Sequence, residues 1–328
     1  MSFDFDAAVT APFRMQPGLR RLAAGALQLT PAGPGSRHQR EKLAVLSAFA
    51  EEALQAAPGF DPRPALGVLA QQAANEHPRH FRWDGHAAES LGVRVCESQV
   101  QRLASGSFGL GDEVSRCLLG LPEDWRLAGL LSLAFEEDFA IVDASGASDN
   151  RPATLPWLAV ALPSHWAPRE KCGQPFIAAH APVADNMLLM QAANHLMRLV
   201  TGQGRWERFV WNVTSHPRLH ALPAHVDPGR WQGRFDPAQA WWRTERQTFI
   251  PLPGRRQAVF TIGVQVRPLQ GALTPAQAAQ LQAAVATMSD AVLAYRSLGE
   301  VRGPLLHWLQ QQAGIHAHET PGAASAGA

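Results

Sequence analysis

The strongest constraint on the fold comes from residues 242–267, where a charged run leads directly into a pair of apolar strands. The run Trp-Arg-Thr-Glu-Arg-Gln-Thr-Phe fills residues 242–249, and apolar residues alternate on both sides of Pro-Gly-Arg-Arg at 253–256. Proline and glycine at that place are typical of a hairpin turn. Burying charged groups beside a strand costs free energy unless they form ion pairs or contact a ligand. The segment therefore predicts a hairpin at 249–267 with a polar site at its entrance.

Composition allows a large buried core and excludes several classes of protein. Hydrophobic residues make up 46% of the 328 residues, and the formal net charge of +1 argues against a nucleic-acid binder. No apolar run is long enough for a membrane span, and the first residues lack a signal-peptide pattern. Cys96, Cys117 and Cys172 are far apart, without metal or disulfide spacing. We therefore expect a cytoplasmic protein with no iron–sulfur cluster of its own.

The order of predicted elements favours an α+β fold. It runs from helices through two strands, a helical crossover and three strands to further helices, the order of a PAS-type sensor domain. The predicted helices lie at 39–57, 64–75, 98–105, within 169–199 and after a capping box at Thr274 and Gln277; the strands lie at 130–143, 157–162, 209–213 and in the 249–267 hairpin.

This order divides the chain into four parts. Residues 1–124 would form a mostly helical region that packs on the core, and residues 125–270 a PAS-like antiparallel sheet with a helical crossover that holds the cofactor. Residues 271–316 would add C-terminal helices. Residues 317–328, which are small and polar, would form a disordered tail.

His180 is the leading candidate for a metal ligand. A neutral imidazole is a common ligand for iron and zinc, and a proximal histidine is a standard heme anchor. The alternative is a histidine beside a helix that bonds a backbone carbonyl. No group of His, Cys, Asp and Glu has the spacing of a zinc site.

Charged residues on two predicted strands could supply the polar part of a cofactor pocket. Strand alternation places Arg243 and Glu245 on one face and Arg246 on the other. Arg208, at the start of the 209–213 strand, could polarise bound dioxygen or hold a heme propionate. Trp211 is large enough to wall a flat cofactor. In each case the alternative is a solvent-facing or structural side chain, and a surface ion pair would contribute little.

Five short motifs, in consistent order, resemble the heme-dependent oxidative N-demethylase family over about residues 12–300. They are Pro-Phe-Arg-Met at 12–15, Lys-Cys-Gly at 171–173, His-Ala-Pro-Val at 180–183, Arg-Thr-Glu-Arg-Gln-Thr at 243–248 and Phe-Thr-Ile at 260–262. One departure follows the histidine motif, since the family often continues with proline where this chain has Ala184 and Asp185.

The resemblance implies an alpha-type subunit with a PAS-like fold and a b-type heme. It implies dioxygen activation and oxidation of an N-methyl group of a small secondary amine such as dimethylamine. Electrons would come from NADPH through partner subunits that carry FMN and an iron–sulfur cluster. His180 would be the iron ligand, Arg243, Glu245 and Arg208 would serve catalysis, and Arg208, Trp211 and Arg246 would contact the cofactor.

Two other functions are compatible with the same sequence. One is a heme-binding or small-ligand PAS-like sensor without turnover, although no kinase, cyclase or DNA-binding segment is present. The other is a scaffold that uses a PAS-like core for dimerisation. A homodimer is also compatible with the enzyme interpretation.

Overall fold

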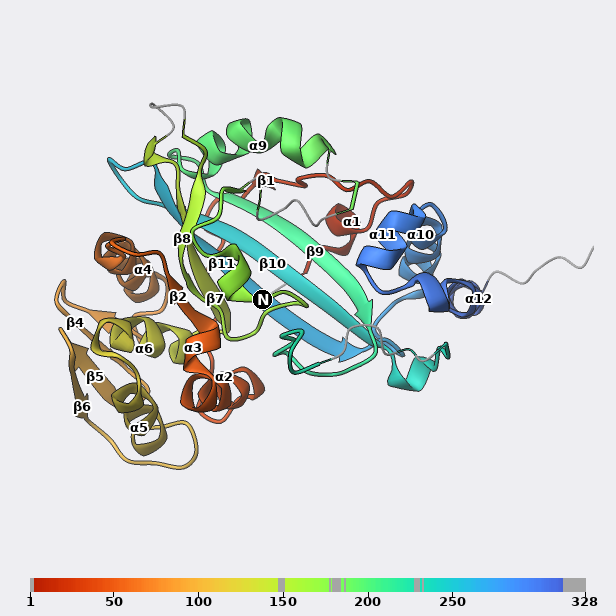
Figure 1. Ribbon diagram of the computed structural model, residues 1–328. Coiled ribbons are helices and arrows are strands. Elements are labelled where there is room, and N and C mark those ends of the chain that lie inside the picture. The colour runs from red at the N-terminus through yellow and green to blue at the C-terminus, as the bar shows by residue number, and fades with distance from the viewer. Residues whose placement is uncertain are drawn as a thin grey trace, which may run out of the picture.

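The computed structural model describes residues 3–146, 151–176, 178, 184–185, 187–226, 231 and 233–314, except for the side chains of residues 188–191. Its centre is a seven-stranded antiparallel sheet with the order β1-β9-β10-β11-β7-β8-β2 (Figure 1). The strands are β1 (Arg20–Arg21), β2 (Leu54–Ala56), β7 (Glu137–Asp143), β8 (Thr154–Ala159), β9 (Trp206–Thr214), β10 (Trp241–Pro251) and β11 (Gln257–Pro268). Helices and antiparallel strands together confirm the predicted α+β class.

The five inner strands follow the predicted order of two strands, a helical crossover and three strands. β7 and β8 come first, α7 (Pro168–Lys171) and α9 (Met187–Val200) lie in the crossover, and β9, β10 and β11 follow. The first and last of these strands, β7 and β11, pair side by side. Figure 1 shows α9 above the sheet, with β9 to β11 as long neighbouring ribbons below it.

The predicted hairpin is confirmed, but its first strand begins earlier than expected. β10 starts at Trp241 and pairs with β11 along its whole length, from Trp241↔Pro268 to Pro251↔Ala258. β9 pairs with the other edge of β10. The charged run therefore lies inside a central strand instead of at its entrance. Arg243 and Glu245 alternate with Trp242, Thr244, Arg246 and Thr248, which lie on the opposite face.

The N-terminal region contains more strand than its sequence predicted. A separate four-stranded antiparallel sheet has the order β3-β4-β5-β6. Its strands are β3 (Arg82–Trp83), β4 (Ala87–Ser90), β5 (Val93–Cys96) and β6 (Gln99–Arg102), so the helix predicted at 98–105 is wrong. The turn between β5 and β6 uses Glu97 at φ 52°, a left-handed conformation that glycine or asparagine usually signals. Glutamate gave no such signal.

Helices surround this small sheet and connect it to the main one. They are α2 (Arg37–Ala48), α3 (Ala50–Ala53), α4 (Arg63–Glu76), α5 (Asp112–Gly120), a 3₁₀ turn at Glu123–Trp125 and α6 (Arg126–Ala134). The last one corrects the strand predicted from residue 130, which begins instead at Glu137. Leucine and alanine are strong helix formers, and because α6 is buried almost all round, it shows no amphipathic period.

The C-terminal helices form a second layer at the far end of β9 and β10 (Figure 1). They are α10 (Pro275–Ala286), α11 (Asp290–Tyr295) and α12 (Arg302–Gln312). The predicted capping box is confirmed, since Thr274 and Gln277 cap each other's backbone at the start of α10. Together with α1 (Phe5–Ala8), these helices bury a second apolar core around Trp211 and Trp242. No helix in the described ranges is long and apolar enough to cross a membrane.

Two neighbouring carboxylates at the start of β7 are buried in different ways. Asp138 pairs with Lys42 at 3.2 Å, and both side chains are almost fully enclosed. Glu137 is also buried, and its Oε2 accepts a 2.8 Å hydrogen bond from the backbone N–H of Thr30. Removal from water disfavours the charged carboxylate more than this bond favours it, and the pKa of Glu137 rises to about 7.

We predict that Glu137→Gln changes how stability depends on pH. A carboxyl whose pKa is raised in the folded state stabilises fully below its unfolded pKa, near 4.5, and loses that contribution as the pH rises through about 7. Glutamine does not titrate, so the variant does not lose this stability. The difference in unfolding free energy, variant minus natural chain, should therefore rise by on the order of 3 kcal/mol from pH 5 to pH 8. Urea denaturation at the two pH values measures the difference. An equal difference at both would contradict the assignment.

Candidate functional site

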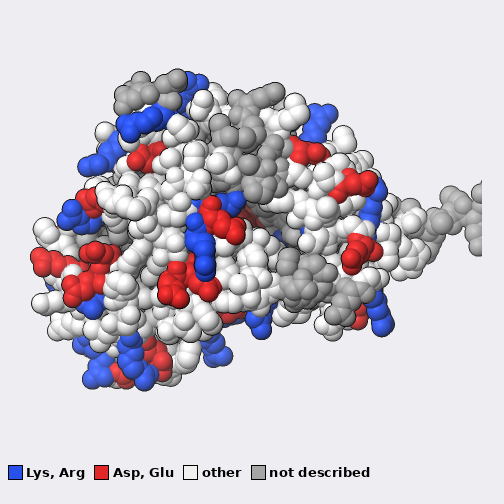
Figure 2. Space-filling model, viewed as in Figure 1, with Lys and Arg blue, Asp and Glu red and all other residues white. Residues whose placement is uncertain are grey.

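One face of the main sheet forms the floor of a cavity of about 450 Å³. This volume falls in the range of small-molecule and cofactor sites. The cavity is covered by α9, by residues 164–176 of the crossover, by residues 15–19 and by residues 295–297. In Figure 2 this side of the molecule is hollowed near its centre, with charged side chains beside the hollow. Segments from both ends of the chain therefore meet over the same sheet face.

Most of the cavity wall is apolar. Phe249 and Phe260 lie opposite each other on β10 and β11, and their rings stack with centroids 4.8 Å apart. Ile262 and Val142 continue this floor toward β7, and Leu196 faces it from α9. Such a wall suits a flat, apolar ligand body, because aromatic and branched side chains bury large areas.

The floor becomes polar where β9 and β10 run side by side. Arg208 of β9 lies opposite Gln247 of β10, and Glu245 lies two residues further along the same face. Gln247 donates a 2.6 Å hydrogen bond from Nε2 to Oε2 of Glu245, whose side chain is mostly buried. The Nε of Arg208 has no hydrogen-bond partner in the described part of the chain. Burial lowers the pKa of Arg208, and the nearby charge of Glu245 partly opposes that shift.

Two further residues reach this polar end from α11, and the sequence did not predict them. Tyr295, the only tyrosine in the chain, borders the cavity and lies within electrostatic range of Arg208 and Glu245. Arg296 places its guanidinium 4.5 Å from the Trp211 ring centre and donates to the Trp211 carbonyl. Burial lowers the pKa of Arg296 to about 10. The adjacent residues Tyr295 and Arg296 could have marked this segment as a candidate site in the sequence. Nothing near them in the sequence, however, indicates that α11 ends over β9.

Arg243 borders the cavity, but its guanidinium is committed to the backbone. The side chain is only 1% exposed. Its Nε donates to the Ser164 hydroxyl at 2.7 Å, and its Nη1 donates to the Arg218 carbonyl at 2.9 Å. Its Nη2 lies within hydrogen-bond distance of three further carbonyls, those of Leu162, Pro163 and Leu219. These donors hold two loops together, and the catalytic role expected of Arg243 stays a prediction.

The loops that Arg243 joins bring a histidine to the cavity. Ser164 and Ala221 form a parallel bridge, and the N–H of His165 donates to the Ala221 carbonyl at 2.9 Å. His165 has φ 61°, an unusual conformation for a residue with a side chain. It lines the cavity, and its ring lies 5.2 Å from the ring of His216. Strained backbone of this kind persists only when the surroundings enforce it, as Arg243 does here.

Two of the expected cofactor contacts are placed differently. The indole of Trp211 stacks on Trp242 at 5.3 Å and donates from Nε1 to the Ala8 carbonyl, so its ring belongs to the second core although the residue still borders the cavity. Arg246 points to the opposite sheet face, where it pairs with Glu207 at 3.0 Å. Alternation along β10 turns it away from the cavity, and its assignment as a cofactor contact stays a prediction.

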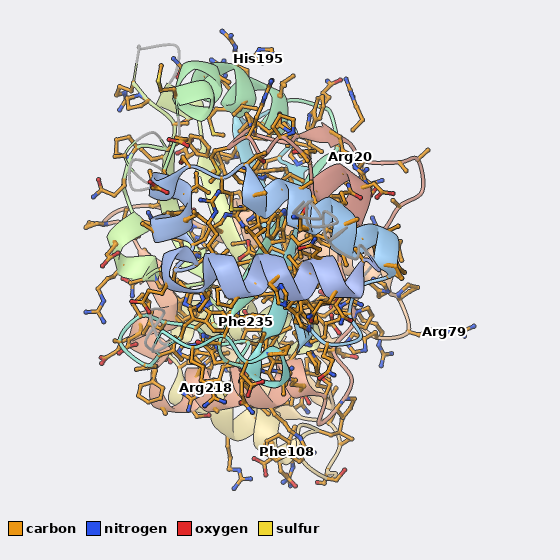
Figure 3. All side chains as sticks on the ribbon, turned by 90° about the vertical axis from the view of Figure 1, so that its right-hand side faces the viewer. Arg20, Arg79, Phe108, His195, Arg218 and Phe235 are labelled. Carbon is orange, nitrogen blue, oxygen red and sulfur yellow. The ribbon has the colours of Figure 1, made fainter. Side chains whose placement is uncertain are left out.

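The proposed iron ligand, His180, lies outside the described residues. His195, the next histidine along the chain, is exposed and projects outward from α9 (Figure 3). Among the described residues, His165 is the one histidine that lines the cavity. No group of three or more potential metal ligands occurs in the described ranges.

A family model described as "Haem-dependent oxidative N-demethylase, alpha subunit-like" matches residues 37–306. The match covers most of the chain and includes β2 to β11 with the cavity floor, as well as Tyr295 and Arg296. No curated protein matches this sequence.

We predict that Arg243→Met destabilises the whole fold. The substitution leaves a serine hydroxyl and several buried carbonyls without their donor, and should cost about 3–5 kcal/mol of unfolding free energy. Arg267→Met is the matched control, because Arg267 is an exposed arginine on β11, and it should change stability by less than about 0.5 kcal/mol. Urea denaturation of both variants measures the difference. A normally stable Arg243→Met protein that has lost only activity would show that Arg243 acts on a ligand instead.

Proposed function

Because the chain belongs to the family of proteins like the alpha subunit of heme-dependent oxidative N-demethylase, we propose that it binds heme b and oxidises an N-methyl group of a small secondary amine such as dimethylamine. The observation that carries this proposal is the two-part cavity, which is apolar over most of its wall and charged at one end. Heme, when bound, supplies dioxygen activation for the oxidative demethylation, with formaldehyde and the demethylated amine as products.

The residues around the cavity fit a heme. Phe249, Phe260 and Ile262 offer a continuous apolar surface to a flat macrocycle. Arg208 and Arg296 each keep a buried Nε without a hydrogen-bond partner in the described part of the chain, which suits the carboxylates that the macrocycle carries. His180 is the proposed iron ligand, in line with the histidine motif that the sequence shares with the family.

The topology supports a PAS-like interpretation of the five inner strands. They follow the order of two strands, a helical crossover and three strands, with the first and last strands paired at the centre. The cavity lies on one face of these strands and under the crossover. A ligand in such a place is enclosed by rigid strands below and by a helix above.

We assign Glu245 to the binding of the substrate amine. A small alkylamine is protonated at neutral pH, like a lysine side chain, and needs a carboxylate or an aromatic face inside a cavity. Glu245 is mostly buried, and Gln247 orients it through Oε2. We propose that its other oxygen, Oε1, accepts an N–H of the ammonium group. Arg208 lies beside it, and we reserve its guanidinium for a carboxylate of the heme.

Electrons would come from outside this chain. The alpha-subunit-like family implies partner subunits, and we propose a cytoplasmic reductase that draws on NADPH and carries FMN and an iron–sulfur cluster. The three cysteines of this chain are free thiols, and they come from three separate places, the end of β5, α5 and the segment after α7. A homodimer is compatible with this arrangement.

The first test is spectroscopic. The purified chain, reconstituted with heme, should show a Soret band that is lost or shifted in His180→Ala. His195→Ala is the matched control, because this exposed histidine of α9 should leave the spectrum unchanged. A natural chain that stays colourless after reconstitution would refute the proposal. Heme binding without amine-dependent oxygen consumption, in the presence of a reductase, would indicate a sensor.

A second prediction concerns the substrate. Glu245→Gln removes the charge that pairs with the ammonium group but keeps the shape of the side chain, so kcat/KM for dimethylamine should fall by about 2 kcal/mol, or roughly thirtyfold. Heme affinity should stay close to that of the natural chain. Glu170→Gln, at the exposed rim on α7, should change kcat/KM by less than about threefold. Equal effects of the two substitutions would argue against Glu245 as the amine site.

A further inference from the structure

We propose that Arg208 and Arg296 together form an anion site at one end of the cavity, and that this site holds the two propionate carboxylates of the heme. The inference rests on the proposed function, since it assigns the orientation of the same cofactor. It names Arg296, which no sequence motif singled out, and it excludes Arg243 from this role.

Arg296 is a buried cation that the protein leaves partly unsatisfied. The residue is 9% exposed, and its guanidinium packs over the rings of Trp211 and Phe13 at 4.5 and 5.0 Å. One of its Nη atoms donates to the Trp211 carbonyl, whereas its Nε has no hydrogen-bond partner in the described part of the chain. Ring faces favour the positive charge only weakly compared with an anion, so a carboxylate is the stronger partner for this donor.

Arg208 approaches the same end of the cavity from the floor. It projects from β9 on the cavity side, and its Nε also lacks a hydrogen-bond partner among the described residues. Arg296 lies over a later part of the same strand, where the Asn212 side chain donates to the Arg296 carbonyl at 3.4 Å. Tyr295 lies close enough to Arg208 and Glu245 to interact with both charges. Both arginines therefore border the same cavity, and Tyr295 lies within electrostatic range of each of them.

The balance of charge at this end favours an anionic ligand group. Six charged residues of the described ranges line the cavity: Arg208, Arg243, Arg296 and Lys171 are positive, and Glu245 and Glu170 are negative; Glu170 and Lys171 belong to α7, away from the strands of the floor. Backbone carbonyls and Ser164 occupy the donors of Arg243. The charge of Glu245 acts on Arg208, whereas no carboxylate of the described residues pairs with Arg296, and buried charge without a partner is unfavourable. A ligand that brings carboxylates to this end removes the imbalance.

The rest of the cavity wall indicates which kind of molecule carries those carboxylates. The stacked rings of Phe249 and Phe260, with Ile262, form an apolar floor next to the charged end. A matching ligand has a broad apolar body with anionic groups along one edge. Heme has this form, and arginine binds carboxylates through two parallel N–H donors.

The test compares heme with its dimethyl ester, in which both carboxylates are blocked. The apoprotein is titrated with each compound, and the Soret band gives the two affinities. The natural chain should bind free heme at least tenfold more tightly than the ester, because a charge-assisted hydrogen bond contributes about that factor. Arg208→Gln and Arg296→Gln should each reduce this preference, and the double variant should bring it close to one. Arg267→Gln, on the exposed part of β11, should keep the full preference.

The ratio of the two affinities is insensitive to a general loss of stability, because both ligands meet the same folded protein. Arg296→Lys keeps the charge and should retain part of the preference even if the glutamine variant folds poorly. Equal affinities of the natural chain for heme and ester would overturn the inference and leave heme binding intact. If neither compound binds, the proposed function fails, and this inference fails with it.

Discussion

The buried guanidinium of Arg243 is the contact on which the cavity depends. It joins a central strand to two loops that are distant in sequence, the one after β8 and the one after β9. A charge this deep is costly in itself, and it is tolerated because five oxygen atoms surround it. Without this contact, the segment that carries Ser164 and His165 would keep its backbone bridge to Ala221 but lose its bonds to β10. Arg243 thus acts on the site by holding its wall in place.

The cavity has an apolar part and a charged part on the same face of the sheet. Its apolar floor lies on β10, β11 and β7, whereas its charged end lies where β9 and β10 pair beneath α11. Water-excluded surroundings strengthen every electrostatic contact at that end. A cationic amine and an anionic cofactor edge can therefore be distinguished by groups only a few residues apart. In our proposal Glu245 binds the first, and Arg208 and Arg296, each with an Nε that has no hydrogen-bond partner in the described part of the chain, bind the second.

Sequence patterns predicted the sheet face correctly because alternation is a local property. The positions of Arg243 and Glu245 on one face and Arg246 on the other follow from the period of two along β10. The purpose of Arg243 could not be predicted, since its partners come from residues 162–164 and 218–219. Local signals also failed for α6, whose leucines are buried all round, and for the turn at Glu97, which lacks glycine. Tyr295 and Arg296 stayed hidden because only the packing of α11 on β9 brings them to the cavity.

The cavity wall also has a consequence for the stability of the chain ends. Residues 15–19 and 295–297 close the cavity from opposite ends of the sequence, and the N–H of Phe13 bonds the hydroxyl of Thr287. A ligand that touches these segments binds more weakly whenever they detach, and by linkage its presence holds them in place. Cofactor loading and the attachment of these two segments therefore form one equilibrium. A substitution that breaks the bond between Phe13 and Thr287, outside the cavity, should therefore weaken ligand binding inside it.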